Sequence, residues 1–292
     1  MSYVNAVVQG ILLGGLYALF ACGLSLLFGV MRIINLAHGD IAVLGAFLTY
    51  EVTTQLGVSP FLALVPVLPT MLVAGYLLQK TVLERSLSSG PLIPLLTTFG
   101  LSILIQNSLL QIFSPDVHSL GPLAGSISVK SLKISDTLSL PYVGMLVLLL
   151  AVAVLGGLQL MLARTPFGRE MRATAQDPDT ASLVGVPASA VYARATAIAV
   201  GTATLAGAFL AIRSTFEPSS GPTQLIFAFE AVVIGGLGSL WGTLVGGIVL
   251  GVAQTVGATI DPQYSILAGH LVFLVILASP RGRFLASRSV AA

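Results

Sequence analysis

Long apolar stretches separated by short polar joints make up most of this chain. A membrane-spanning α-helix needs about 20 mostly apolar residues, and several stretches meet or approach that length. They are Val4–Val30, Gly39–Val58, Pro60–Lys80, Pro91–Phe113, Pro141–Ala163, Val191–Ile212, Ile226–Ala258 and Tyr264–Ser279. The pattern predicts an all-α, polytopic helical bundle in a membrane.

The stretch Ile226–Ala258 is too long for one span, and glycines interrupt it at Gly235, Gly236, Gly238 and Gly242. Two short spans fit it, and so does one re-entrant segment followed by one span. The whole chain is therefore expected to cross the membrane eight or nine times.

Arginine and lysine positions predict the orientation, because short cytoplasmic loops collect these residues. Three such regions are the loop Arg164–Tyr192, the tail after Pro280 with Arg281, Arg283 and Arg288, and the joint that carries Lys80 and Arg85. Placing all three inside puts Arg32 inside and the N-terminus outside. This arrangement is self-consistent only if Ile226–Ala258 crosses twice, which favours nine crossings.

The joint Ser114–Leu140 is then an outside segment. It is polar, with charged positions such as Asp116 and Lys130, and its short alternating runs are compatible with a hairpin.

The composition supports this interpretation and excludes other classes. Only 8% of the 292 residues are charged and 55% are hydrophobic, with a mean hydropathy of +0.98, whereas a soluble domain carries about 25% charged residues. A net charge of +2 gives no basis for nucleic-acid binding. The single cysteine, Cys22, excludes a disulfide framework.

A polar cluster separates the first two apolar stretches. Within FGVMRIINLAHGDIAVL it contains Arg32, Asn35, His38 and Asp40. Lipid offers polar groups no partners, so such a break needs protein, water or the interface around it. Two interpretations stay open: His38 and Asp40 cap the second helix while Asn35 bonds locally, or the cluster is part of a gate.

The inner loop contains the signals of a short helix. Asp177 is placed to cap it, Pro178 to occupy its first position, Asp179 to add charge in its first turn, and Gly185 to end it. A small helix of about two turns, parallel to the membrane surface, would suit a cytoplasmic partner as a docking element. The other interpretation is that it is an ordinary capped loop helix.

Glu230 lies among apolar residues in FAFEAVVIGG. A carboxylate at mid-membrane costs about 2.5–3.5 kcal/mol on insertion scales, so it is expected to face a partner or a wet cavity. Arg213 is the first electrostatic partner to test, and both a structural and a pathway role stay open. His270 is expected to be a hydrogen-bonded packing residue.

Glycines four residues apart follow the broken stretch. The pairs Gly242/Gly246 and Gly247/Gly251 are small-residue spacings that let helices approach closely in membranes. We expect a helix-packing surface there, within the chain or toward a second subunit, and a turn or broken helix at Gly235–Ser239.

The motifs of catalysis are missing from the sequence. No Gly-rich loop ends in Gly-Lys-Ser/Thr, since the only lysines are Lys80, Lys130 and Lys133, and no HExxH or Gly-x-Ser-x-Gly pattern occurs. The sequence predicts a transport protein and not an enzyme.

Three ordered motifs resemble one family. GLYALFACGLSLLFGVMRIINLAHGDIAVLGAF, GREMRATAQDPDTASLVGV and FEAVVIGGLGSLWGTLVGGIVLG are similar to segments of bacterial branched-chain amino acid ABC transporter permeases, the membrane subunits of binding-protein-dependent importers. The resemblance covers nearly the whole chain.

The resemblance implies one transmembrane permease domain over 1–292, with a cytoplasmic coupling loop at about 164–190, in a bacterial inner membrane. It implies a second homologous permease, two cytoplasmic ATPases that bind the ATP and Mg, a periplasmic solute-binding protein, and no cofactor on this chain. The residues that would dock an ATPase are Asp177, Pro178, Asp179, Thr180, Ala181 and Gly185. Those expected on the translocation path or gate are Asn35, His38, Asp40, Glu230, Gly235, Gly236 and Gly238.

Other solutes and mechanisms stay open at this point. Related subfamilies carry urea, short-chain amides or other small organic acids, although the long extra N-terminal region that is common in the urea type is absent here. A self-sufficient secondary transporter would instead couple protons or sodium through Glu230 and Asp40.

Overall fold

The computed structural model describes residues 3–87, 90, 92–135 and 138–279. Its α-helices are α1 Tyr3–Met31, α2 His38–Leu56, α3 Pro60–Leu78, α4 Glu84–Leu87, α5 Leu92–Phe113, α6 Ser126–Val129, α7 Tyr142–Arg164, α8 Pro166–Gln176, α9 Pro178–Leu183, α10 Ala188–Arg213, α11 Gly221–Gly235, α12 Leu240–Ile260 and α13 Tyr264–Ala278. A π-helical segment covers Gln79–Leu83, and 3₁₀ turns cover Pro122–Ala124 and Pro218–Ser220. Strands β1 Ser131–Ser135 and β2 Leu138–Pro141 complete the fold.

Membrane spans are the main elements of the described part. Six helices are long and apolar enough to cross a membrane: α1, α3 continued to Leu87, α5, α7, α10 and α12, while α13 is a shorter apolar helix. The prediction of an all-α bundle is therefore confirmed, apart from the small β1–β2 hairpin. The number of eight or nine crossings stays a prediction.

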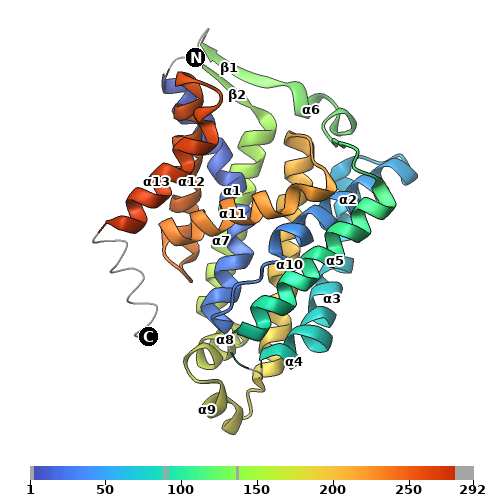
Figure 1. Ribbon diagram of the computed structural model, residues 1–292, viewed down its shortest axis with the longest axis vertical. Coiled ribbons are helices and arrows are strands. Elements are labelled where there is room, and N and C mark those ends of the chain that lie inside the picture. Colours follow the sequence, from blue (N-terminus) through green and yellow to red (C-terminus); the bar gives the residue numbers. More distant parts are fainter. Residues whose placement is uncertain (1–2, 88–89, 91, 136–137, 280–292) are drawn as a thin grey trace.

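Helices α1 and α10 form the centre of the bundle (Figure 1). Helix α1 is apolar around its whole circumference, which is typical of a buried helix, and most of its side chains are buried. Helix α10 is rich in alanine, glycine and threonine, and these small side chains let neighbours approach closely. Helices α2 and α3 pack on α10, and helices α7, α11 and α12 pack on α1.

The third apolar stretch is longer than predicted. We expected it to end at Lys80, but the helical backbone continues through the π-helical segment and α4 to Leu87. The wider π turn places Gln79 in the interior, where its Oε1 accepts a hydrogen bond from Oγ1 of Thr196 at 2.8 Å. This buried partner explains why a polar residue lies within the helix.

The two ends of the bundle carry different elements (Figure 1). Helices α4, α8 and α9 gather at one end, and α6 with the β1–β2 hairpin lies at the other. The pattern of Ser114–Leu140 was compatible with a hairpin, and β1 and β2 form an antiparallel pair there. The tail arginines after Pro280 lie outside the described residues.

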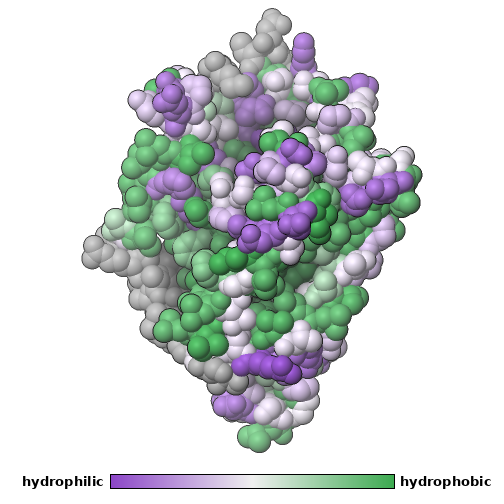
Figure 2. Space-filling view, turned by 45° about the vertical axis from the view of Figure 1, so that its right-hand side comes forward, coloured by the Kyte–Doolittle hydropathy of each residue, from purple (hydrophilic) through white to green (hydrophobic). Residues whose placement is uncertain are grey.

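The surface has the distribution expected of a membrane protein. Figure 2 shows apolar residues over most of one face, with hydrophilic residues gathered in its upper part and near its lower tip. Large exposed apolar side chains such as Leu104, Leu149 and Leu274 belong to α5, α7 and α13. Exposure on this scale indicates contact with lipid or with another subunit.

Candidate functional site

The break between α1 and α2 is buried and locally ordered. Arg32 has a positive φ of 55° that turns the chain away from α1, and Oδ1 of the buried Asn35 accepts the backbone N–H of Ala37 at 3.0 Å. The local role expected for Asn35 is therefore observed. The capping role expected for His38 and Asp40 is wrong, because Ala37 is the N-cap and makes no side-chain capping bond.

His38 instead connects α2 to α1. Its Nε2 lies 2.9 Å from the carbonyl oxygen of Phe20, and the residue is buried. Helix α2 begins at His38 in the interior of the bundle, so a buried side chain there has to find a partner on a neighbouring helix. The carbonyl on α1 supplies it.

Asp40 connects α2 to α5. Its Oδ2 accepts a hydrogen bond from Oγ of Ser102 at 2.5 Å, and its Oδ1 accepts one from Nε2 of Gln106 at 3.0 Å. The start of α11 lies against the same carboxylate, since a Cβ added to Gly221 would come within 1.9 Å of Oδ1. Asp40 is thus held between three elements.

A polar stripe on α5 faces the break. Thr98, Ser102 and Gln106 are four residues apart, and Oγ1 of Thr98 accepts the backbone N–H of Leu36 at 3.1 Å. Residues four apart lie on one face of a helix. The sequence analysis did not identify these residues, although polar positions with helical spacing in an apolar stretch were a usable signal.

Glu230 is paired with His270. The residue is 3% exposed, and its Oε1 lies 2.5 Å from Nδ1 of His270 on α13. The expected partner Arg213 is wrong: its Nη1 donates to the backbone oxygen of Leu12 at 3.5 Å. Arg213 is the last residue of α10, whereas the Glu230 side chain meets α13, which packs on α11 and α12. His270 is hydrogen-bonded, as expected.

Glu230 also lines an apolar cavity of about 330 Å³. The cavity lies between the α1–α2 break, α5, α11 and α13. Its walls include Ile34 and Leu36 from the break, Leu95 from α5, and Phe229 and Phe273. The structure thus brings the break and Glu230, which are far apart in the sequence, to the same cavity.

The joint between α11 and α12 is formed by glycines. Gly236 and Gly238 have φ values of +93° and +81°, which side-chain-bearing residues rarely adopt. The Ser239 hydroxyl then caps α12 by accepting the N–H of Gly242 at 3.1 Å. The predicted division of Ile226–Ala258 into two helices is confirmed.

Glycines also occupy the closest contacts of α12. A Cβ on Gly242 or Gly246 would come within about 2 Å of the backbone oxygens of Gly235 and Ala231 on α11. On the opposite side, a Cβ on Gly247 or Gly251 would come within 2.7 or 2.3 Å of the backbone oxygens of Gly14 and Gly10 on α1. Helix α12 is therefore held between α1 and α11 at backbone-contact distance.

The loop between α7 and α10 contains two helices, of which one was predicted. Oδ1 of Asp177 accepts the backbone N–H groups of Asp179 and Thr180 at 3.0 and 3.1 Å, and Pro178 is the first helical residue. The end has the hydrogen bonds of a Schellman motif, Gly185 N to Ser182 O at 3.1 Å and Val186 N to Ala181 O at 3.0 Å, with Gly185 at φ +86°. The predicted capped helix, α9, is confirmed.

Helix α8 was not predicted. The Thr165 hydroxyl caps it by accepting the N–H of Gly168 at 3.0 Å, and Pro166 is its first residue. Thr165–Pro166 is thus the same kind of start signal as Asp177–Pro178. Arg194 on α10 holds α8 in place, through an ion pair with Glu170 at 3.1 Å and a guanidinium 4.7 Å from the ring centre of Phe167.

The tip of α9 is apolar and exposed. Leu183 is 87% exposed and Val184 is 75% exposed, whereas Ala181 is buried against the bundle. Neither apolar residue was singled out from the sequence. The sequence does not show that these two side chains are exposed at the end of α9, and only the structure does.

The family model described as branched-chain amino acid transport system / permease component matches residues 6–279 of this chain. The chain belongs to this family. It is a multi-pass membrane protein whose relatives are transport permease subunits.

The named relatives cover almost the same length. The chain is 28% identical to the high-affinity branched-chain amino acid transport system permease protein BraD of Pseudomonas aeruginosa, over 96% of this chain and 95% of BraD. It is 27% identical to LivH of Escherichia coli K12, which has the same description, over 97% of this chain and 95% of LivH. A solved structure titled PsaBC from Streptococcus pneumoniae in complex with Fab is 16% identical, with 99% and 96% of the two chains covered and a TM-score of 0.48. That similarity is too low to carry an argument.

The family match includes all the site residues described above, from the α1–α2 break to His270. The polar groups within the apolar helices therefore lie in the part of the chain that matches the permease family.

Proposed function

We propose that this chain is the membrane permease subunit of an ATP-driven importer for branched-chain or other hydrophobic amino acids. It acts as a single transmembrane domain in a bacterial cytoplasmic membrane, beside a second homologous permease. Two cytoplasmic ATPases bind and hydrolyse ATP, and a periplasmic solute-binding protein delivers the solute. Family membership and the descriptions of BraD and LivH support this proposal.

The observation that carries the proposal is the exposed apolar tip of α9. The Asp177 side chain caps the start of this helix and a backbone Schellman turn ends it, and Leu183 and Val184 project from it. Exposed apolar side chains on a polar loop indicate a protein-binding surface. An ATPase groove that accepts these side chains would move α9 as a unit, and Asp177, Pro178, Asp179, Thr180, Ala181 and Gly185 maintain its shape.

The cavity beside Glu230 supports an aliphatic amino acid as the solute. Its walls are apolar, which suits a branched side chain, and Oε2 of Glu230 has no hydrogen-bond partner among the described residues. A carboxylate there attracts an α-ammonium group. Urea has neither an aliphatic part nor a positive charge, so this cavity suits it poorly.

Access to the cavity is controlled by the segments that border it. Asn35, His38 and Asp40 fix the α1–α2 break, and the flexible backbone at Gly235, Gly236 and Gly238 lets α11 and α12 change their relative position. The packing glycines Gly247 and Gly251 keep α12 against α1 during that change, whereas Gly242 and Gly246 form the contact with α11 that shifts.

Transport in proteoliposomes tests this function. Permease reconstituted with its ATPases is expected to import leucine only with ATP and the binding protein, and Leu183→Asp is expected to abolish uptake. The matched control Ala173→Asp places the same charge at an exposed position one helix away and is expected to retain uptake. Leucine flux of full rate through the permease alone would refute the proposal and favour a secondary transporter.

A further inference from the structure

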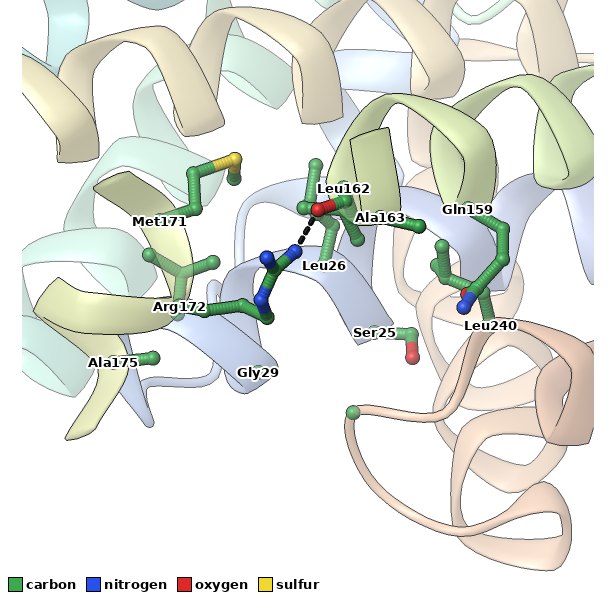
Figure 3. Close-up of a pocket in the computed structure, with 12 residues that line it drawn as sticks. Ser25, Leu26, Gly29, Gln159, Leu162, Ala163, Met171, Arg172, Ala175 and Leu240 are labelled. Atoms are coloured by element: carbon green, nitrogen blue, oxygen red, sulfur yellow. Dashed lines mark hydrogen bonds between the residues drawn. The ribbon is translucent and has the colours of Figure 1, made fainter. Parts of the chain in front are cut away.

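A second cavity, of about 460 Å³, lies at the end of the bundle that carries α8 and α9. It is lined by the C-terminal parts of α1 and α7, by α8 and by the α11–α12 joint. Figure 3 shows Arg172 of α8, Gln159 of α7 and Ser25 of α1 around it. It is separate from the cavity beside Glu230, with which it shares no lining residue.

The polar groups of this cavity favour an anion. The Arg172 guanidinium donates one hydrogen bond to the backbone oxygen of Leu162, which leaves most of its five N–H donors free. Among the described residues, no acidic side chain lines the cavity and no ion pair includes Arg172. A cation without a counter-charge attracts a negatively charged ligand.

Ser25 supplies a second, independent indication. Ser25 is 0% exposed, and its Oγ has no hydrogen-bond partner among the described residues. In Figure 3 this hydroxyl points into the gap between α1 and the joint before α12. A buried hydroxyl without a partner is costly, and a ligand oxygen in the cavity would satisfy it.

The start of α12 adds to the positive potential. This 21-residue helix begins at Leu240, which lines the cavity. The N-terminal end of a helix carries a partial positive charge and free N–H groups. The C-terminal ends of α1 and α7 also lie near the cavity, and they carry a partial negative charge that opposes this effect. The net attraction for an anion therefore comes from the charge of Arg172.

A tryptophan beside the cavity indicates that the cavity lies at the level of a membrane interface. Trp241, which follows Leu240, is 46% exposed, and its ring lies 3.9 Å from the position of a Cβ on Gly156 of α7. Tryptophan with an exposed ring is typical of the boundary between lipid and water. The remaining walls, which include Leu26, Val30 and Met171, are apolar.

We propose that this cavity binds the phosphate of an anionic phospholipid of the inner leaflet, with Arg172 and Ser25 as its hydrogen-bond donors. The glycerol and the first acyl carbons lie along the apolar walls. The proposal relies on the inner placement of α8 in the proposed function. A lipid bound here contacts both α8, which leads into α9, and the glycine joint at Gly238.

The chain carries its own probe of this site, because Trp241 is its only tryptophan. Full-length permease without partners is reconstituted in phosphatidylcholine vesicles that contain brominated phosphatidylglycerol or, at equal mole fraction, brominated phosphatidylcholine. Bromine quenches tryptophan fluorescence at contact. The apparent affinity is expected to be about fivefold higher for phosphatidylglycerol, which corresponds to the contribution of one basic side chain near the surface.

Three variants and one competitor make the result decisive. Arg172→Gln and Ser25→Ala are expected to remove the preference, whereas Arg169→Gln, an exposed arginine on the same helix, retains it. Equal quenching by the two lipids in the unsubstituted protein would overturn the proposal, as would a preference that survives Arg172→Gln. Loss of the preference in inorganic phosphate at constant ionic strength would overturn the lipid assignment. Because no ATPase is present, failure here is distinguishable from failure of the proposed transport function.

Discussion

Nδ1 of His270 lies 2.5 Å from Oε1 of Glu230, so one of the two carboxylate oxygens on α11 is paired with a helix at the periphery of the bundle. His270 also stacks on Phe227, with ring centres 6.3 Å apart. The pair therefore attaches α13, whose surface is otherwise mostly exposed, to α11.

The pair is expected to be strongly coupled. His270→Ala leaves a buried carboxylate without its partner and is expected to lower the thermal midpoint of the purified permease by more than the double variant Glu230→Gln/His270→Ala does. The coupling free energy expected for contacting residues is about 0.5–3 kcal/mol. A double-mutant cycle in one detergent measures it, and additive effects would show that the two side chains do not depend on each other.

The Asp40 contacts predict a second effect on stability and uptake. Replacing Ser102 with Ala and Gln106 with Leu together leaves the Asp40 carboxylate without its α5 donors, which costs about 1–3 kcal/mol for each unsatisfied buried group. Asn107→Leu is the matched control, because Asn107 is exposed and its side chain donates only to Ile103 O of its own helix. Thermal midpoints and leucine uptake are measured for both. Equal behaviour of the two variants would contradict this role of Asp40.

Close helix contacts predict opposite outcomes for two glycines. Gly251→Ala places a Cβ 2.3 Å from the backbone oxygen of Gly10, and the required backbone shift costs about 1–3 kcal/mol. Gly157→Ala meets nothing within 4 Å and is expected to be neutral or to stabilise by about 0.4–1 kcal/mol. The yield of monodisperse protein and its thermal midpoint distinguish the two. A Gly251→Ala protein as stable as the unsubstituted one would show that α1 and α12 do not need this approach.

Substitutions at Gly185 are expected to weaken the coupling between ATP hydrolysis and uptake by different amounts. Nothing lies within 4 Å of a Cβ at this position, so the effect of a substitution comes from its φ of +86° and not from a clash. Valine is expected to strain the turn by about 1–2 kcal/mol, and asparagine, which tolerates this conformation, by less. ATP-dependent uptake should therefore fall in the order Gly, Asn, Val. A fully coupled Gly185→Val permease would argue against a fixed α9.

The stability of the first turn of α9 is expected to depend on pH, because its cap is the carboxylate of Asp177. The hydroxyl of Thr180 and the backbone N–H groups at the helix start hold the pKa of Asp177 below its usual value. The capping contribution is therefore fully present above the unfolded pKa of about 3.9 and is lost as the pH falls through the lower folded pKa. Hydrogen exchange at Thr180, corrected for the intrinsic rate, is expected to report this loss only at the acid end of a titration from about pH 6 to pH 3.

Asp177→Asn is the control for this titration, because asparagine also caps helices but has no carboxyl group to protonate. Its Thr180 protection should stay flat over the same range. A parallel decline in both proteins would mean that the fold, and not the cap, responds to acid.

Local signals made much of the fold predictable. Apolar length located the long helices, glycines located the joint of α11 and α12, and Asp177 with Pro178 and Gly185 located α9, because each acts through the backbone nearby. Helix α8 was missed although Thr165–Pro166 is the same kind of signal.

Partners across the bundle were not predictable in the same way. Arg213 was the first partner to test for Glu230 because of its charge, whereas the orientation of the Glu230 side chain toward α13 depends on packing that no local pattern encodes. Likewise, capping was one of the two interpretations left open for Asp40, and its donors on α5 were not found because they are more than 60 positions away in the chain.

Only Asp177 separates α8 from α9, and the Schellman turn leads within a few residues to α10. This connection therefore contains few residues outside helices and turns that could absorb a displacement of α9. In the proposed function, a movement that an ATPase imposes on the tip would therefore reach the start of α10, a central transmembrane helix, with little loss, and the loop would act as a rigid lever. A flexible insertion between Gln176 and Asp177 would break the backbone hydrogen bond from Asp177 N to Ala173 O, and it is expected to weaken this transmission.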